Sequence, residues 1–382
     1  MGQYLDVQLN PFVFNRPVGV EDLIDRDKEA LQLLRLAEGG HAVRLSAPRR
    51  YGKTSLLRRV GEEAEKAGMN YVEVDFYGVL SRQEVAQRLE EGYEKLRSAP
   101  RRIARAAIET LRPSVSLGAA GVRVESRPRT EEQVGRRLSG LLDLPVRLFE
   151  RTAQRTLVAF DEFQALLAVD PGIDGLFRSR IQRQGDAASY IFAGSHPGLM
   201  TQLFGAHERP FFGQARSIPL DPLSDADIVE HVGARFEATG KEVGRAIDPL
   251  LDLAAGHPQR AMLLAHHLWE QVAVGVEADA VHWRTALDDV FAEQDDALRA
   301  TWDSLEVKEQ AVFRALAIGE PVFGAWTLEH FNLSKGGAQH ARGALAHAGH
   351  IQQRDGVWWP VDPLLARWVA DFQHNVGEDP SR

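Results

Sequence analysis

The stretch SAPRRYGKTSLL, residues Ser46 to Leu57, decides how this sequence is interpreted, because it nearly matches the phosphate-binding loop pattern G-x-x-x-x-G-K-[ST]. It departs from the pattern at one position, where Ala47 replaces the first glycine. Alanine adds one methyl group at the strand exit, which the loop tolerates unless φ at that residue is strongly positive. The apolar run HAVRLSA precedes the loop, and the amphipathic run TSLLRRVGEEAEKAG follows it. Strand, loop and helix in this order are the context that the motif requires.

In a loop of this kind the backbone N–H groups point inward and, together with the helix dipole, hold phosphate oxygens. We expect Lys53 to contact the β- and γ-phosphates, Thr54 to offer its hydroxyl to Mg²⁺, and Gly52 to permit close backbone approach. The alternative is a surface turn capped by a lysine. The residues predicted to contact the nucleotide here are Ala47, Pro48, Arg49, Arg50, Tyr51, Gly52, Lys53, Thr54 and Ser55.

A second run, TLVAFDEF over residues 156–163, places Asp161 and Glu162 after four apolar residues. In proteins with such a loop, a strand of this kind carries the aspartate to the Mg²⁺ shell, and the adjoining glutamate polarises the attacking water. An acidic cap at a strand end is the alternative for the pair taken alone. Loop and acidic pair together predict nucleotide binding, and hydrolysis depends on how Glu162 is oriented.

A third run, YIFAGSHPGLM, ends a strand with a small polar residue. It is expected to place Ser195, or His196, near the γ-phosphate. The alternative is that Gly194 and Ser195 cap the next helix.

Composition sets the broad class. The chain has 382 residues, which predicts two or three domains, and its 44% hydrophobic and 26% charged residues are ordinary for a globular protein. No run approaches the roughly 18 apolar residues of a membrane span, and MGQYLDVQLNPF lacks a signal-peptide core. The absence of cysteine excludes disulfides, thiolate metal sites and a cysteine nucleophile. We therefore expect a cytoplasmic protein with no membrane partner.

Charge is distributed unevenly. The net charge of −9 argues against a chain coated in DNA-binding surface. Between Ser98 and Thr130, however, seven arginines face two glutamates. This segment is a candidate contact for nucleic acid or an acidic protein, and the alternative is a solvated arginine-rich surface. Its arginines are Arg101, Arg102, Arg105, Arg112, Arg123, Arg127 and Arg129.

Strand and helix signals alternate up to residue 223, which predicts a parallel sheet with crossover helices. The strand candidates are HAVRLSA and residues 71–78, 156–163, 189–195 and 216–223, with helical sequence after Arg82 and from Glu131 to Glu150. Two alternating runs around GAAG, within 113–128, predict an inserted hairpin. A cap at Ser224 or Asp225 then opens a helical region that extends to about Arg299.

The last section mixes helices with a hairpin, which describes a winged helix-turn-helix. A helix over 305–318 and two short helices precede IQQRDGVWWPVDP, which is expected to turn at Asp355-Gly356. The predicted division is an N-terminal segment packing on the nucleotide site (1–40), a P-loop ATPase core (41–223) with a basic hairpin insertion (about 98–130), a helical lid (224–299), a winged-helix domain (300–375) and a disordered tail (376–382).

The order of these motifs, from about Asn10 to Phe372, resembles the prokaryotic (archaeal-type) ATPases of the STAND group within the AAA-like P-loop NTPases. PRRYGKTSLL and DEFQ carry the resemblance most specifically. It implies an α/β fold with an ASCE-type parallel-sheet core, a helical lid and a C-terminal winged helix, with ATP and Mg²⁺ as cofactors. Gln164 belongs to the same signature, without an assigned role. Asp25 stands where relatives often carry glycine.

The resemblance also implies roles for residues outside the loop. Arg26 in LIDRD is expected on the adenine side, Gly256-His257-Pro258 to pack on bound nucleotide, and Arg260 to reach the γ-phosphate. AAA-type proteins take a further arginine from a neighbouring copy, which implies a homo-oligomer in the ATP state. The candidates here are Arg178, Arg180 and Arg183, of which Arg180 is the one predicted to act in catalysis.

The predicted recognition helix, SKGGAQHARGALAHAGH, is poor in the basic and amide side chains that read DNA. This favours a winged helix that acts as an intramolecular clamp, as in STAND proteins, while DNA binding stays open. Residues available for DNA are Gln339, Arg342, Gln352, Gln353 and Arg354. Histidines do not predict a metal site, since adjacent ones face different ways and no carboxylate lies at ligand spacing. They are His266, His267, His340, His347 and His350.

Three functions follow from these patterns. The favoured hypothesis is an ATP-switched regulatory or signalling ATPase that closes on Mg·ATP and is reset by slow hydrolysis. The second is a DNA-associated ATPase, similar to origin-recognition proteins, that uses the winged helix and the basic hairpin. The third is a nucleotide-binding scaffold with negligible turnover.

Overall fold

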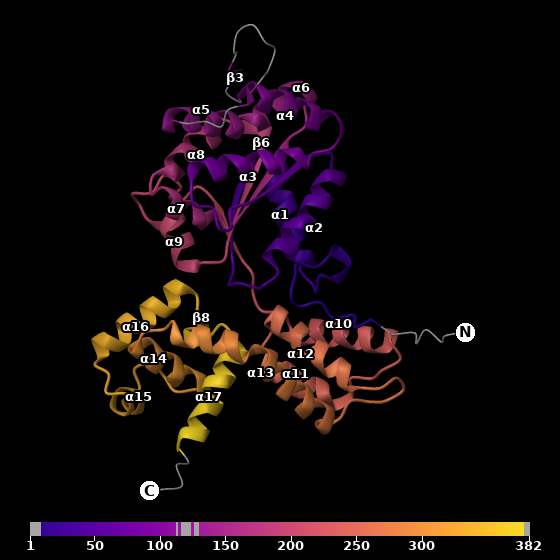
Figure 1. The fold of residues 1–382 in the computed structure, drawn as a ribbon, viewed down its shortest axis with the longest axis vertical. Helices are drawn as coiled ribbons and strands as arrows, with labels where there is room; N and C mark the ends of the chain where they lie inside the picture. Colours follow the sequence, from indigo (N-terminus) through magenta and orange to yellow (C-terminus); the bar gives the residue numbers. More distant parts are fainter. Residues whose placement is uncertain (1–8, 112–113, 116–123, 126–129, 378–382) are drawn as a thin grey trace. The chain divides into compact units, whose positions relative to one another are not determined.

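The computed structural model describes residues 9–111, 114–115, 124–125 and 130–377 (Figure 1). The chain divides into two compact units. The first unit comprises Met1–Asp25, Pro48–Gly52 and Asp221–Arg382, and the second comprises Arg26–Ala47 and Lys53–Leu220. The chain therefore leaves the second unit at the phosphate loop and returns to it five residues later.

The second unit is built on a parallel sheet, as the sequence predicts. Its strands are β1 (Ala42–Ser46), β2 (Asn70–Asp75), β5 (Thr156–Asp161), β6 (Ala188–Gly194) and β7 (Arg216–Pro219), in the order β2-β5-β6-β1-β7. β5 and β6 are buried at every position. Strands covered by helices on both faces require such continuous apolar sequence. The strand that ends in the acidic pair is separated from β1 by β6.

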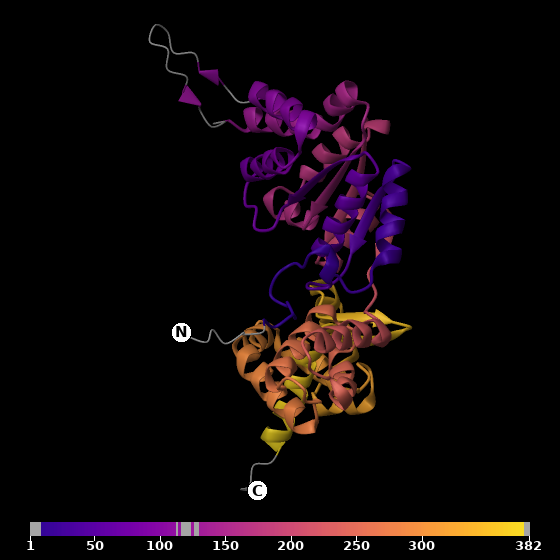
Figure 2. The same cartoon turned by 90° about the vertical axis from the view of Figure 1, so that its right-hand side faces the viewer.

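Helices cover both faces of this sheet (Figures 1 and 2). On one face, Val74, Phe160 and Phe192 join a single core with the helices from α3 to α9. On the other face, α1 and α2 contact β1, β2 and β5. The helices are α1 (Asp27–Glu38), α2 (Lys53–Lys66), α3 (Arg82–Glu94), α4 (Ser98–Leu111), α5 (Glu131–Leu142), α6 (Leu144–Thr152), α7 (Leu166–Val169), α8 (Ile173–Ile181) and α9 (Pro197–Gly205).

The basic segment differs from its prediction. Residues 98–111 form helix α4, because Ala104 and Ile108 lie one turn apart on a buried face. The predicted hairpin consists of β3 (Ser114–Val115) paired antiparallel with β4 (Val124–Glu125). The arginines Arg112, Arg123, Arg127 and Arg129 lie outside the described residues.

The helix predicted from Glu131 to Glu150 is two helices. Asp143 ends α5, and Pro145 stands in the first turn of α6. Proline favours the start of a helix because its missing N–H is not needed there.

The first unit is largely helical. Ser224 caps its first helix, since its hydroxyl accepts a hydrogen bond from the N–H of Asp227 at 3.2 Å. The hairpin turns at Asp355 and Gly356, whose φ values of 49° and 83° suit a tight two-residue turn. The elements are α10 (Asp225–Ala238), α11 (Ile247–Ala254), α12 (Pro258–Gln271), α13 (Ala280–Asp303), α14 (Val307–Ala317), α15 (Ala325–His330), α16 (Lys335–Ala348), β8 (Ile351–Arg354), β9 (Val357–Pro360) and α17 (Pro363–Gly377).

One apolar core connects the described helices of the first unit from α10 to α17. Phe12 of the N-terminal segment belongs to it and lies 5.6 Å from Phe236 between ring centroids. The winged-helix assignment and the five-part division stay predictions. No helix in the described ranges combines the length and the apolar character needed to cross a membrane.

Candidate nucleotide site

Three neighbouring strands end at the same edge of the sheet. β1, β5 and β6 end at Ser46, Asp161 and Gly194, and Ser46 lies opposite Gly194 in the register. The N–H of Ala47 donates to the carbonyl of Gly194 at 3.4 Å. Open α/β sheets bind ligands beyond the carboxyl ends of their strands. The start of the phosphate loop, the acidic pair and Ser195 therefore meet at this edge.

The structure explains why alanine stands at position 47. Ala47 is buried and is not among the described residues with positive φ. Left-handed conformations fall instead on Arg50 and Gly52, with φ of 65° and 81°. The position that lacks the usual glycine therefore does not need one. A left-handed arginine costs on the order of 1 kcal/mol, so Arg50 is the strained residue of the loop.

Lys53 and Thr54 begin α2 next to the acidic strand. Lys53 is 5% exposed, and its Nζ donates to the carbonyl of Ala47 at 2.9 Å. Thr54 Oγ1 donates to Asp161 Oδ2 at 2.7 Å, and Asp161 Oδ1 accepts the N–H of Glu162 at 3.0 Å. Burial raises the pKa of Asp161, although the Thr54 hydrogen bond and the nearby Lys53 charge oppose it.

This pair fits a magnesium ion chemically. Mg²⁺ prefers hard oxygen ligands and commonly takes only one or two protein groups, completing its shell with water and substrate phosphates. The Thr54 hydroxyl and the buried Asp161 carboxylate supply two such oxygens. Burial raises the pKa of the Asp161 carboxyl group, and a cation beside it would lower that pKa by stabilising the ionised form.

Glu162 follows Asp161 in a left-handed conformation, with φ of 50°. Its Oε2 accepts two hydrogen bonds, one from Ser195 Oγ at 2.7 Å and one from Gln164 Nε2 at 2.5 Å. The short 3-10 helix η2 (Phe163–Ala165) turns Gln164 back toward the glutamate. Sequence reasoning gave Gln164 no role, and the DEFQ motif was the only signal for one.

The cap of helix α9 is His196. Its Nδ1 accepts the N–H of Leu199 at 3.4 Å, while Ser195 is directed to Glu162. The alternative that Gly194 and Ser195 cap this helix is therefore wrong.

Two predicted arginines have other local partners. Arg26 is the buried N-cap residue of α1 and pairs with Glu29 at 2.9 Å. Arg180 pairs with Asp143 at 3.1 Å, close to where Gln184 binds the carbonyl of Leu142 just before β6 begins. This is the amino-terminal edge of the sheet, opposite the acidic pair. Arg180 therefore lies away from the Glu162 of its own chain, and action on a neighbouring copy stays a prediction.

The Gly256-His257-Pro258 motif shapes the start of α12. Gly256 has φ of 72°, and a Cβ there would lie 2.6 Å from the Leu223 carbonyl oxygen. His257 caps the helix by accepting the Arg260 N–H at 3.4 Å, and Pro258 occupies its first turn. Burial lowers the pKa of His257 to about 4, so its imidazole is neutral at pH 7. Contact with nucleotide stays a prediction.

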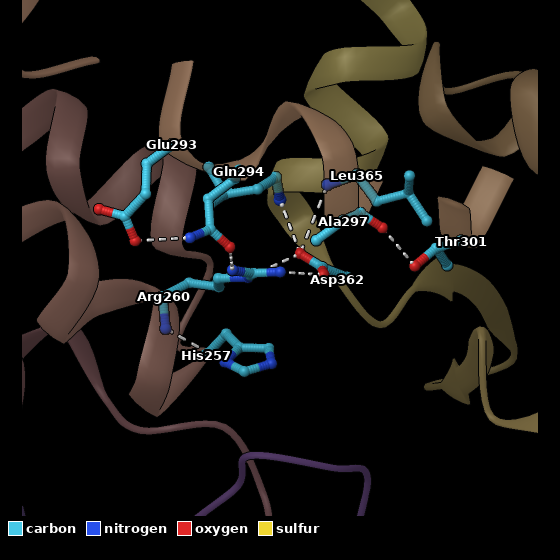
Figure 3. A network of polar contacts seen from close by, with 9 residues as sticks. His257, Arg260, Glu293, Gln294, Ala297, Thr301, Asp362 and Leu365 are labelled. Atoms are coloured by element: carbon cyan, nitrogen blue, oxygen red, sulfur yellow. Dashed lines mark hydrogen bonds and ion pairs between the residues drawn. The ribbon is translucent and has the colours of Figure 1, made fainter. Parts of the chain in front are cut away.

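Arg260 is fully engaged within the first unit (Figure 3). It is 3% exposed; its Nε donates to Asp362 Oδ1 at 2.9 Å, its Nη2 pairs with Oδ2, and its Nη1 donates to Gln294 Oε1 at 3.2 Å. Burial raises the pKa of Asp362, but the charge and hydrogen bonds of Arg260 outweigh it and keep that pKa below its usual value. The predicted γ-phosphate arginine is thus held by the turn before α17.

Tyr51 anchors the phosphate loop in the first unit. Its side chain is 1% exposed, and its ring lies edge-on to the His257 ring with centroids 4.8 Å apart. Its hydroxyl accepts a hydrogen bond from Arg354 Nη2, in the hairpin, at 3.0 Å. Arg50 lies nearby, and burial and the charge of Arg260 lower its pKa. These contacts explain why Pro48–Gly52 belongs to the first unit although both flanking segments belong to the second.

The histidine pair of α12 has structural partners. His266 Nδ1 lies 2.9 Å from the Phe12 carbonyl oxygen, and His267 Nε2 lies 3.0 Å from Glu293. The pair therefore ties the N-terminal segment and α13 to α12.

Comparison with known proteins agrees with this architecture. Residues 21–91 match the profile of a family described as an AAA-like domain. The Walker-type ATPase PABY2304 of Pyrococcus abyssi is 19% identical, with a TM-score of 0.68 over 93% of this chain and 98% of that one. The Aeropyrum pernix ORC2 protein, in ADPNP–ADP complexes, is 14% identical, with a TM-score of 0.57 over 95% and 96%. No curated protein gives a significant match.

The chain therefore has the fold of the P-loop ATPases, with a parallel five-stranded sheet and a helical C-terminal region. This confirms the predicted fold class. At these identities the likeness establishes the fold, and the residues at the strand ends carry the argument about activity.

Proposed function

We propose that this protein binds Mg·ATP and hydrolyses it slowly, as a nucleotide-dependent switch in regulation or signalling. The observation that carries the proposal is the cluster at the strand ends of the second unit. There Thr54 is bonded to a buried Asp161, and Glu162 follows directly with its own carboxylate held by Ser195. A hydroxyl, a metal-binding carboxylate and a second carboxylate for water are the parts that phosphoryl transfer to water requires.

Each residue has a distinct part in the proposed reaction. Lys53 and the loop N–H groups hold the β- and γ-phosphates, while Thr54 and Asp161 hold Mg²⁺. When bound, the ion neutralises charge that develops on the phosphate oxygens. A water oxygen bonds to the γ-phosphorus as the bond to the β–γ bridging oxygen breaks, which yields ADP and phosphate. Glu162 accepts the proton of that water, and its Oε1 accepts no hydrogen bond from any other described residue.

Two contacts within the first unit support the proposed switch. Tyr51 ties the phosphate loop to His257 of the lid and Arg354 of the hairpin, and Asp362 holds Arg260. A ligand shifts a conformational equilibrium only by its differential affinity for the two states. Because the loop makes these contacts, nucleotide that binds to the loop would also affect His257 and the hairpin. Because Arg354 is bonded to Tyr51, it favours a winged helix that acts as an intramolecular clamp over a hairpin that reads DNA.

The central test is titration of Mg·ATP into the purified full-length protein by calorimetry, with phosphate release measured in parallel. We expect binding and slow release in the wild type. Lys53→Ala should lose most of both, because it removes the ammonium that holds the phosphates. Glu162→Gln should keep binding and lose about 10²–10⁴-fold in turnover, the usual contribution of a positioned base.

The matched control for Lys53→Ala is Lys66→Ala at the other end of α2, where the side chain is exposed and pairs with Glu63. It should leave both measurements unchanged. No heat with the wild type would refute nucleotide binding. Turnover that persists in Lys53→Ala would refute hydrolysis at this loop.

A DNA-associated ATPase is the second candidate, and one observation favours it. Arg101, Arg102 and Arg105 are all exposed on α4, and the ion pair that Arg105 makes with Glu109 is itself exposed. Contacts of this type with phosphates weaken steeply as salt rises from about 50 to 200 mM. DNA binding with that salt dependence, lost on changing the three arginines to alanine but kept in Arg136→Ala on α5, would support it. ATP turnover that DNA leaves unchanged would count against it.

A further inference from the structure

Gln164 is placed where it determines the direction of the proposed catalytic base. Its Nε2 donates to Glu162 Oε2 at 2.5 Å, the same oxygen that Ser195 Oγ reaches at 2.7 Å. Two donors from two elements, η2 and the end of β6, therefore converge on one carboxylate oxygen. These two hydrogen bonds hold Oε2, and they leave the other oxygen of Glu162 for a water molecule.

The backbone makes such a restraint necessary. Glu162 has φ of 50°, so it leaves the strand through a sharp left-handed turn and receives no lateral support from the sheet ladder beyond Asp161. Its backbone N–H is fixed by Asp161 Oδ1, but its side chain has further rotatable bonds. A general base must reach its proton within about 2.6–3.2 Å, so rotation of this side chain would cost rate.

The other end of the Gln164 amide shows that packing alone does not explain this residue. Gln164 is 7% exposed, and its Oε1 is buried without a hydrogen-bond partner among the described residues. Leaving a buried acceptor unpaired costs about 1–3 kcal/mol. Methionine has a similar length and carries no such acceptor, so it would fill this volume without the penalty.

The surroundings give the amide one orientation. A Cβ on Gly194 would lie 2.4 Å from Gln164 Oε1, so the glycine at the end of β6 provides the space for the carbonyl. Reversing the amide would turn its oxygen toward the Glu162 carboxylate, where two acceptors would repel. The amide therefore presents its N–H group to Glu162 in the packed state.

We propose that Gln164 is a positioning residue for ATP hydrolysis, which holds Glu162 Oε2 through its amide N–H so that Oε1 faces the attacking water. This inference rests on the proposed function of the site. It predicts that the N–H donor matters for turnover and not for nucleotide affinity, because Gln164 touches neither Lys53 nor Thr54 in any described hydrogen bond.

The test uses full-length protein with Mg·ATP and measures kcat, KM, ATP affinity and melting temperature. Gln164→Met keeps volume and removes the donor, so we expect kcat to fall about 10–100-fold while KM and affinity stay within about twofold. The matched control is Gln184→Met, the same change at a buried glutamine that bonds Leu142 and Tyr190 at the opposite edge of the sheet. It should lower the melting temperature and leave kcat within about twofold.

The outcomes separate this inference from the proposed function. If the wild type turns over ATP and Gln164→Met matches it in kcat, the positioning role is overturned while the function stands. An equal loss in Gln184→Met would overturn it too. If the wild type binds ATP without releasing phosphate, hydrolysis and the positioning role in it are both overturned, while nucleotide binding stands.

Discussion

At the scale of single residues, the loop shows how local geometry decides which side chains are interchangeable. The sequence pattern draws attention to Ala47, yet Ala47 is not among the described residues with positive φ. Arg50 and Gly52 carry the left-handed conformations instead. The deviation from the motif is therefore conservative.

This difference gives a paired prediction. Ala47→Gly should change ATP affinity by no more than about twofold, because it removes one buried methyl group without relieving strain. Gly52→Ala forces a side chain into φ of 81° and should cost about 1–2 kcal/mol, which lowers affinity about tenfold. Calorimetric titration of both variants with Mg·ATP checks this. Equal losses would show that position 47 needs glycine after all.

The limits of sequence reasoning are also set at this scale. Lys53, Thr54, Asp161, Glu162 and Ser195 were found because motif spacing and strand ends bring them to one edge of the sheet. The engagement of Arg260 by Asp362 was not, because the two are separated by 102 positions and no local pattern links them. The hydrogen bond between Gln164 and Glu162 depends on a 3-10 turn that periodicity does not reveal.

At the scale of elements, periodicity located the strands, but some predicted strands extended beyond their actual last residues. β7 ends at Pro219 rather than at Leu223, since proline cannot extend the ladder. Helix α17 was not anticipated, because the winged-helix pattern already accounted for the preceding hairpin. The predicted basic hairpin insertion was placed over about 98–130, whereas Ala104 and Ile108 make residues 98–111 a helix.

The hairpin and the phosphate loop should be energetically coupled through Tyr51. Tyr51→Phe removes the hydroxyl but keeps the ring against His257, and Arg354→Ala removes its donor. We expect a coupling of about 1 kcal/mol in a double-mutant cycle, the net value of one such hydrogen bond. Chemical denaturation and ATP affinity measure it.

The control for this cycle is Arg367→Ala on α17, an exposed arginine paired with Asp371 at 2.8 Å. Paired with Tyr51→Phe, it should give additive effects. Additivity of Tyr51→Phe with Arg354→Ala would show that the hairpin does not influence the loop.

At the scale of the whole molecule, the buried His257 and the half-buried His231 link stability to pH. The pKa of His257 is lowered to about 4 and that of His231 also to about 4, in both cases chiefly by burial. The unfolded chain binds these protons near pH 6.5, so it holds more protons than the folded chain between about pH 4 and 6.5. Their contribution to stability is complete above that range and is lost as pH falls through it.

We therefore expect the free energy of unfolding to decrease between pH 7 and pH 5, by about 2 kcal/mol from His257 alone. His257→Gln keeps a cap acceptor and should flatten this slope, while His207→Gln, at an exposed site, should not. Urea denaturation at several pH values provides the measurement. An unchanged slope in His257→Gln would contradict the assignment. Asp362 adds nothing in this window, because the pKa of its carboxyl is lowered from a value already below pH 4.

Asp362 has one further property of consequence. Besides pairing with Arg260, its Oδ1 accepts the backbone N–H groups of Leu364 and Leu365 at the start of α17, at 3.1 and 3.4 Å. If the guanidinium moves toward another anion, the Asp362 carboxylate keeps its hydrogen bonds to the start of α17. Movement of the arginine therefore breaks one ion pair but does not leave a buried carboxylate without hydrogen bonds, so the exchange is reversible.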